Sequence, residues 1–159
     1  MNLSKPNRVA RTYVQHLVAG PDRVFPLLCP VREADWIEGW DPVVVHSQSG
    51  VAETDCVFVT AAQPHDAIWT ITRHEAQAGV IQMIKVTPGV TVCRLDIELQ
   101  PAPAGTHARV TYTHTSLGPA GDEFIASFTE AHYQHFMQDW ELRLNHYLQH
   151  GSALHLPAG

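Results

Sequence analysis

The chain has 159 residues, 45% of them hydrophobic and 16% charged, which is the composition of one globular domain with a lightly charged surface. Its net charge is -6 with histidine neutral. Binding to nucleic acid or to anionic lipid requires an excess of lysine and arginine, which this chain lacks. No stretch approaches the ~20 apolar residues of a membrane-spanning helix, and the first residues lack the apolar run of a signal peptide. We therefore expect a soluble, cytoplasmic protein that neither binds nucleic acid nor inserts into a membrane.

The first part of the chain predicts a strand and then two short helices. Residues 8–18, RVARTYVQHLV, are rich in β-branched and aromatic types, which favour a strand. Pro21 suits the first turn of a helix through DRVFPLL, which Cys29 and Pro30 end. A second short helix is predicted within VREADWIEG, before Gly39 and Pro42.

The middle of the chain predicts six strands with turn residues between them. The expected strands cover residues 42–47, 56–60, 67–75, 80–87, 90–100 and 107–117. In the fifth, apolar and polar residues alternate along VTVCRLDIELQ, so one face is expected to be buried. No helix intervenes and the connections are short, so the sheet is expected to be antiparallel.

The last part of the chain predicts one long helix from an N-cap at Asp122 to His150, ended by Gly151. Its apolar stripe has helical spacing and should pack on the sheet: Tyr133, Phe136, Met137, Trp140, Leu144, Tyr147 and Leu148. Other apolar residues point elsewhere on the helix: Phe124, Phe128 and Leu142. They are consistent with a homodimer interface, or with a kink that lets Phe124 and Phe128 line a cavity. Residues 151–159 are expected to be a flexible tail.

This element order resembles the START-like superfamily, also called SRPBCC or Bet v 1-like. The segments that carry the resemblance are LVAGPDRVFPLLCP, RLDIELQPAPAGTHARVTYTHT and the long terminal helix. PVREADWIEGW, TYTHTSLGPAGDEFI and WELRLNHYL resemble an uncharacterised bacterial subgroup. The resemblance implies an α+β helix-grip fold in one domain over residues 1–150, with a curved seven-stranded antiparallel sheet, in the order β-α-α-β6-α, around the C-terminal helix and an apolar cavity.

The segment EADWIEGWDP contains two of the four tryptophans, Trp36 and Trp40, and is expected at the mouth of that cavity. The rings could be rim packing, with each indole N–H bonded to a carbonyl, or one of them could contact a ligand. Short acidic segments are usually solvated or capping, so we do not expect a catalytic pair among the acids: Glu33, Asp35 and Glu38.

The last strand places His114 and Tyr112 on its inward face, where His114 could be a general base, a ligand contact or a structural residue. We predict that the ligand site is formed by Trp36, Trp40, Phe58, Trp69, Met83, Leu95, Tyr112, His114 and Phe128. His132 and His135, with Asp139, are a weak metal pattern, because zinc needs three or four ligands. Cys29, Cys56 and Cys93 form no CxxC pair and are expected to be reduced, although a disulfide stays open.

We therefore predict a domain that binds a small hydrophobic or aromatic molecule between sheet and helix, as a carrier or sensor. Motifs for nucleotide cofactors, zinc proteases and serine hydrolases are absent, so we predict no cofactor and no metal. Two alternatives stay open. The resemblance allows a polyketide cyclase- or aromatase-like enzyme that uses the same cavity, and it allows a protein-binding domain like the chaperone activators.

Overall fold

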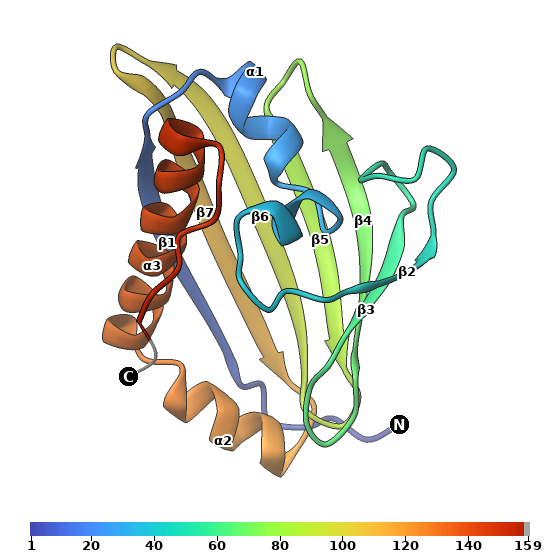
Figure 1. The fold of residues 1–159 in the computed structure, drawn as a ribbon. Coiled ribbons are helices and arrows are strands. Elements are labelled where there is room, and N and C mark those ends of the chain that lie inside the picture. Colours follow the sequence, from blue (N-terminus) through green and yellow to red (C-terminus); the bar gives the residue numbers. More distant parts are fainter. Residues whose placement is uncertain (158–159) are drawn as a thin grey trace.

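A curved antiparallel sheet wraps around the C-terminal helix in the structure, which is a computed structural model that describes residues 1–157 (Figure 1). The elements in chain order are β1 (Arg8–Leu17), α1 (Pro21–Val24), the 3-10 helices η1 (Phe25–Leu27) and η2 (Arg32–Asp35), β2 (Val43–His46), β3 (Val57–Thr60), β4 (Ala67–Glu75), β5 (Val80–Thr87), β6 (Thr91–Ala102), β7 (Gly105–Ser116), α2 (Pro119–Ser127) and α3 (Glu130–His150). The predicted helix-grip fold, with seven antiparallel strands and a long C-terminal helix, is confirmed, and one further helix, α2, precedes that helix.

The seven strands form one sheet in the order β1-β7-β6-β5-β4-β3-β2, and every neighbouring pair is antiparallel. Six strands follow the chain as successive hairpins, whereas β1 returns to pair with β7. The register of β6 and β7 places Leu95 opposite Tyr112 and Cys93 opposite His114. Strand alternation then puts these four side chains on the same face of the sheet.

That face is concave and carries the core. Alternate residues of β6 are buried, as the pattern of the segment predicted: Thr91, Cys93, Leu95, Ile97 and Leu99. Helix α3 runs along β1 and β7 over this face (Figure 1) and buries its matching stripe: Tyr133, Met137, Trp140, Leu144 and Leu148. Burial of these apolar side chains is the main favourable contribution to folding.

The prediction of a single helix over residues 122–150 is wrong, because the helix is interrupted between α2 and α3. The Thr129 side chain accepts a hydrogen bond from the His132 backbone N–H at 3.2 Å, so it starts a new helix as an N-cap. Phe128 leaves the helical conformation there and is buried. Asp122 is likewise not an N-cap but lies inside α2, where it accepts a hydrogen bond from Asn7 at 2.7 Å.

The break separates the three apolar residues that were considered for a subunit interface. Phe128 is buried and Phe124 is half-buried, whereas Leu142 remains exposed on α3. They do not form one exposed patch, and a homodimer stays a prediction.

The segment after α1 crosses in front of β5 and β6 (Figure 1). The expected second helix is only the short η2, and Gly39 follows with a φ of +78°, a conformation that glycine adopts without steric cost. In the C-terminal tail, His155 contacts the Glu38 carboxylate at 3.3 Å. The last two positions of the expected flexible tail, 158–159, lie outside the described residues. None of the helices that the structure describes is both long and apolar enough to cross a membrane.

Candidate ligand-binding cavity

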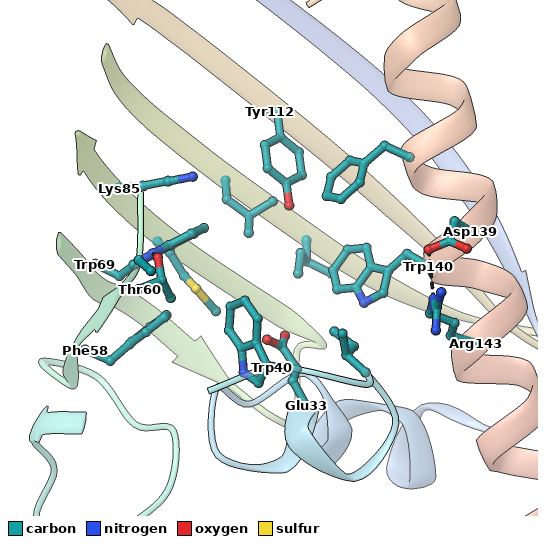
Figure 2. Close-up of a pocket in the computed structure, with 16 residues that line it drawn as sticks. Glu33, Trp40, Phe58, Thr60, Trp69, Lys85, Tyr112, Asp139, Trp140 and Arg143 are labelled. Atoms are coloured by element: carbon teal, nitrogen blue, oxygen red, sulfur yellow. Dashed lines mark hydrogen bonds and ion pairs between the residues drawn. The ribbon is translucent and has the colours of Figure 1, made fainter. Parts of the chain in front are cut away.

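A cavity of about 350 Å³ lies between the sheet, α3 and the segment that contains η2 (Figure 2). This volume falls within the range of small-molecule sites. Its walls are mostly aromatic and aliphatic, and the lining residues are Glu33, Ile37, Trp40, Phe58, Thr60, Ala61, Trp69, Met83, Lys85, Leu95, Ile97, Tyr112, Phe136, Asp139, Trp140 and Arg143.

The wall formed by β3, β4 and β5 is held by aromatic stacking. The rings of Phe58 and Trp69 stack with their centroids 5.3 Å apart and their planes 11° apart. The indole N–H of Trp69 donates a hydrogen bond to Thr60 Oγ1 at 2.9 Å, which orients the ring. This wall therefore presents flat apolar surface with its own polar atoms already paired.

Lys85 lines the cavity because it follows Ile81 and Met83 on the inward face of β5. Its ammonium lies 5.0 Å from the centroid of the Trp69 ring, a cation–π contact. It makes no hydrogen bond or ion pair with any residue that the structure describes. Burial lowers the pKa of Lys85, since the charged form is poorly solvated there.

Glu33, on η2, points into the cavity beside Trp40 (Figure 2). Within residues 1–157 its carboxyl group has neither a hydrogen bond nor an ion pair. Burial raises the pKa of Glu33 to about 8, so the group is largely protonated at neutral pH. Glu33 is half-buried at the cavity, while Asp35 is exposed and pairs with Arg32 at 2.7 Å.

Tyr112 extends from β7 with its hydroxyl directed into the cavity from the side opposite Glu33 (Figure 2). Burial, followed by the nearby Cys93 and Glu33, raises the pKa of this phenol well above its usual value. The group therefore stays protonated and can donate a hydrogen bond. No acceptor for it exists among the described side chains and backbone groups.

Helix α3 closes the other side of the cavity with Phe136 and Trp140 and with an ion pair between Arg143 and Asp139 at 2.9 Å (Figure 2). The indole N–H of Trp140 is buried and has no acceptor in the described part of the chain. Its ring stacks on Trp36 with centroids 5.8 Å apart.

Of the nine residues predicted for the ligand site, six line this cavity: Trp40, Phe58, Trp69, Met83, Leu95 and Tyr112. The structure places the other three outside its lining: Trp36, His114 and Phe128. Trp36 is fully buried behind Trp140, and its indole N–H donates to the Leu27 carbonyl at 2.9 Å. Trp40 donates to the Pro30 carbonyl at 2.8 Å, so both indole N–H groups bond to carbonyls, as the rim-packing alternative described.

His114 lies in an aromatic cluster beneath α2. Its ring is 4.8 Å from Phe124 and 4.5 Å from Phe128, centroid to centroid, and Nδ1 has no partner among residues 1–157. Burial, with a smaller effect of the Lys85 charge, lowers the pKa of His114 to about 4. The ring is therefore neutral at pH 7 and packs as a core residue.

No three histidine, cysteine, aspartate or glutamate side chains gather as metal ligands in the described range. His132 and His135 are exposed on the surface of α3. The three cysteines, Cys29, Cys56 and Cys93, are free and buried.

Five polar residues of the cavity lining were not among the predicted ligand-site residues: Glu33, Thr60, Lys85, Asp139 and Arg143. The signal for Lys85 was present, because it has the same strand parity as Met83, which was assigned inward. Glu33 had no such signal. Its direction depends on how a four-residue 3-10 helix and the turn at Gly39 orient the segment against the sheet.

No protein-family model and no curated protein sequence matches the chain. Solved structures do match over most of its length. Norcoclaurine synthase from Thalictrum flavum, in complex with dopamine and hydroxybenzaldehyde, is 10% identical with a TM-score of 0.65, over 91% of this chain and 89% of its own. Ara h 8.0201 is 13% identical with a TM-score of 0.63, over 90% of this chain and 99% of its own.

A third similar structure is DynU16, a putative protein in the dynemicin biosynthetic locus, at 18% identity and a TM-score of 0.57. The match covers 91% of this chain but 48% of DynU16, so this chain spans about half of that protein. At such identities the similarity concerns the fold. The sheet order, the long C-terminal helix and these structures together show that the chain has the Bet v 1-like helix-grip fold.

Proposed function

We propose that this domain binds a small aromatic molecule in the cavity between the sheet and α3. The observation that carries the proposal is the cavity of about 350 Å³ whose walls include Trp40, Phe58, Trp69, Phe136 and Trp140. Aromatic walls bind flat apolar ligands through area burial and stacking. Norcoclaurine synthase supports the choice of ligand class, because its structure holds two small aromatic compounds on the same fold.

Calorimetric titration with 2-naphthol tests the proposal. Leu95→Phe places extra volume in the cavity and should weaken binding by about tenfold or more, a loss of about 1.4 kcal/mol. Ile68→Phe is the matched control, since Ile68 is 47% exposed on the outward side of β4. If Leu95→Phe does not fold, Ala61→Trp at the exposed edge of the cavity replaces it. Equal affinity for the wild type and both cavity variants would contradict the proposal.

An enzyme that uses the same cavity, for instance a cyclase acting on a polyketide-like ring precursor, is the second candidate. The observation that favours it is Glu33, whose pKa of about 8 suits proton transfer near neutral pH. Lys85 and Tyr112 would stabilise negative charge on a substrate oxygen. Turnover that Glu33→Gln abolishes, with unchanged substrate affinity, would support the enzyme over the binding protein.

A further inference from the structure

Besides the indole N–H of Trp140, three polar side chains in the cavity make no hydrogen bond or ion pair within the described chain, and they come from three different elements. Glu33 comes from η2, Lys85 from β5 and Tyr112 from β7, and all three line the same space. All three side chains are partly exposed, and their polar atoms are open to the cavity, where a bound molecule can hydrogen-bond to them. Their convergence on one largely apolar space therefore points to a ligand that carries matching polar groups.

Glu33 and Lys85 do not pair with each other. They form no ion pair within residues 1–157, and Figure 2 shows them on different sides of the cavity, on η2 and on β5. The two groups are therefore held apart on separate walls. A ligand has to be long enough to reach both.

The other charges near the cavity are already paired. Asp139 and Arg143 form an ion pair with each other on α3. Thr60 accepts the indole N–H of Trp69. The recognition groups that remain open are a carboxyl, an ammonium, a phenol and the indole N–H of Trp140.

We infer that the ligand is a hydroxylated aromatic acid, whose anionic group pairs with Lys85 and whose hydroxyl group hydrogen-bonds to Glu33 at the far end of the ring system. This inference rests on the proposed binding function. Lys85 lacks a carboxylate partner, so a ligand anion supplies the missing countercharge. Glu33 offers both a donor and an acceptor when protonated, which matches a hydroxyl group. Tyr112 adds a hydrogen-bond donor for one of these two ligand groups.

The aromatic core of such a ligand would lie against Trp69 and Trp140. Both rings line the cavity on opposite walls, and the polar atom of Trp69 is turned into the protein toward Thr60. Flat apolar surface thus separates the two polar ends, as it does in the inferred ligand.

Calorimetric titrations of three probes test this inference: 2-naphthol, 2-naphthoic acid and 6-hydroxy-2-naphthoic acid, at pH 7. The wild type should bind 6-hydroxy-2-naphthoic acid most tightly. Lys85→Met should raise the Kd of both acids by about tenfold or more, while the Kd of 2-naphthol should change by less than about threefold. Glu33→Leu should weaken the binding of the two hydroxylated probes and leave the affinity for 2-naphthoic acid unchanged.

Arg94→Met and Glu38→Leu are the matched controls, because they remove the same charges from exposed positions on β6 and beside η2. They should leave the preference among the probes unchanged. If all three probes bind the wild type and neither Lys85→Met nor Glu33→Leu changes the preference, the inference is overturned while the proposed binding function stands. If none of the probes binds the wild type, both are overturned.

Discussion

Trp36 stacks on Trp140 with ring centroids 5.8 Å apart and ring planes 20° apart, which joins the segment after α1 to the C-terminal helix. The contact lies directly behind the cavity, since Trp140 lines it and Trp36 does not. It makes Trp36 a structural residue that supports the cavity wall, whereas Trp40 is part of the wall.

Trp36→Phe should therefore lower the free energy of unfolding by about 1–3 kcal/mol, because the buried Leu27 carbonyl loses its donor. Trp40→Phe should cost less stability, since Trp40 is only half-buried, but should weaken 2-naphthol binding. Urea denaturation and calorimetric titration of both variants measure this contrast. Equal effects of the two substitutions on both quantities would rule out the division of roles.

His114 should make the fold sensitive to mild acid. Its pKa falls from 6.5 to about 4 on folding, so the unfolded state binds the proton first as the pH drops. The groups packed around it are aromatic or neutral apart from Lys85: Phe124, Phe128, Tyr112 and Cys93. Relative to His114→Leu, the wild type should lose about 3 kcal/mol between pH 7 and pH 4.

Urea denaturation of both proteins across this range isolates His114, because the other histidines contribute equally to each. Parallel stability curves would show that His114 does not titrate between these two pKa values.

Glu33 should make the stability of the fold decrease as the pH rises, which is the opposite of the effect of His114. Its pKa rises from 4.5 to about 8 on folding, so stability is lost as the pH rises through this range. Both proteins contain His114, so its contribution cancels, and the wild type should fall in stability relative to Glu33→Gln up to about pH 8. Denaturation curves at pH 6.5, 7.5 and 8.5 measure the difference. A constant difference would mean that the Glu33 carboxyl is hydrated in the cavity.

Gly121 should tolerate no side chain. A Cβ atom there would lie 2.0 Å from the Val90 carbonyl oxygen and 2.6 Å from Ser116 Oγ. Gly121→Ala should thus destabilise the protein by about 1–3 kcal/mol despite the higher helix propensity of alanine. Glu123→Ala, at an exposed position of the same helix, is the control. Equal thermal unfolding of the two variants would contradict the close packing of α2 on β7.

The sheet could be predicted from the sequence because its signal is local. Alternation along β6 and turn residues between the strands specify both the faces and the hairpins. The break at Thr129 could not be predicted in the same way, since a threonine inside a helical pattern becomes an N-cap only when Phe128 turns into the core.

The same difference between local and tertiary signals separates the predicted from the unpredicted residues of the candidate site. Phe58, Trp69, Met83, Leu95 and Tyr112 were predicted from strand parity, which alone decides the face on which a side chain lies. Glu33 depends on the orientation of an irregular segment, and periodicity carries no information about it. His114 had the correct inward parity, yet α2 covers it, so inward direction did not amount to access to the cavity.

The methyl NMR signal of Met83 tests the central claim most directly. The chain has three methionines, and Met83 alone among them lines the described cavity, while Met1 is exposed and Met137 is buried elsewhere on α3. In protein labelled with ¹³C at the methionine methyl groups, saturating 2-naphthol should shift the Met83 signal through the ring current of the bound probe and leave Met1 unchanged. In Leu95→Phe the same shift should require an about tenfold or higher concentration of 2-naphthol. A Met83 signal that stays in place at saturation would contradict binding between the sheet and α3.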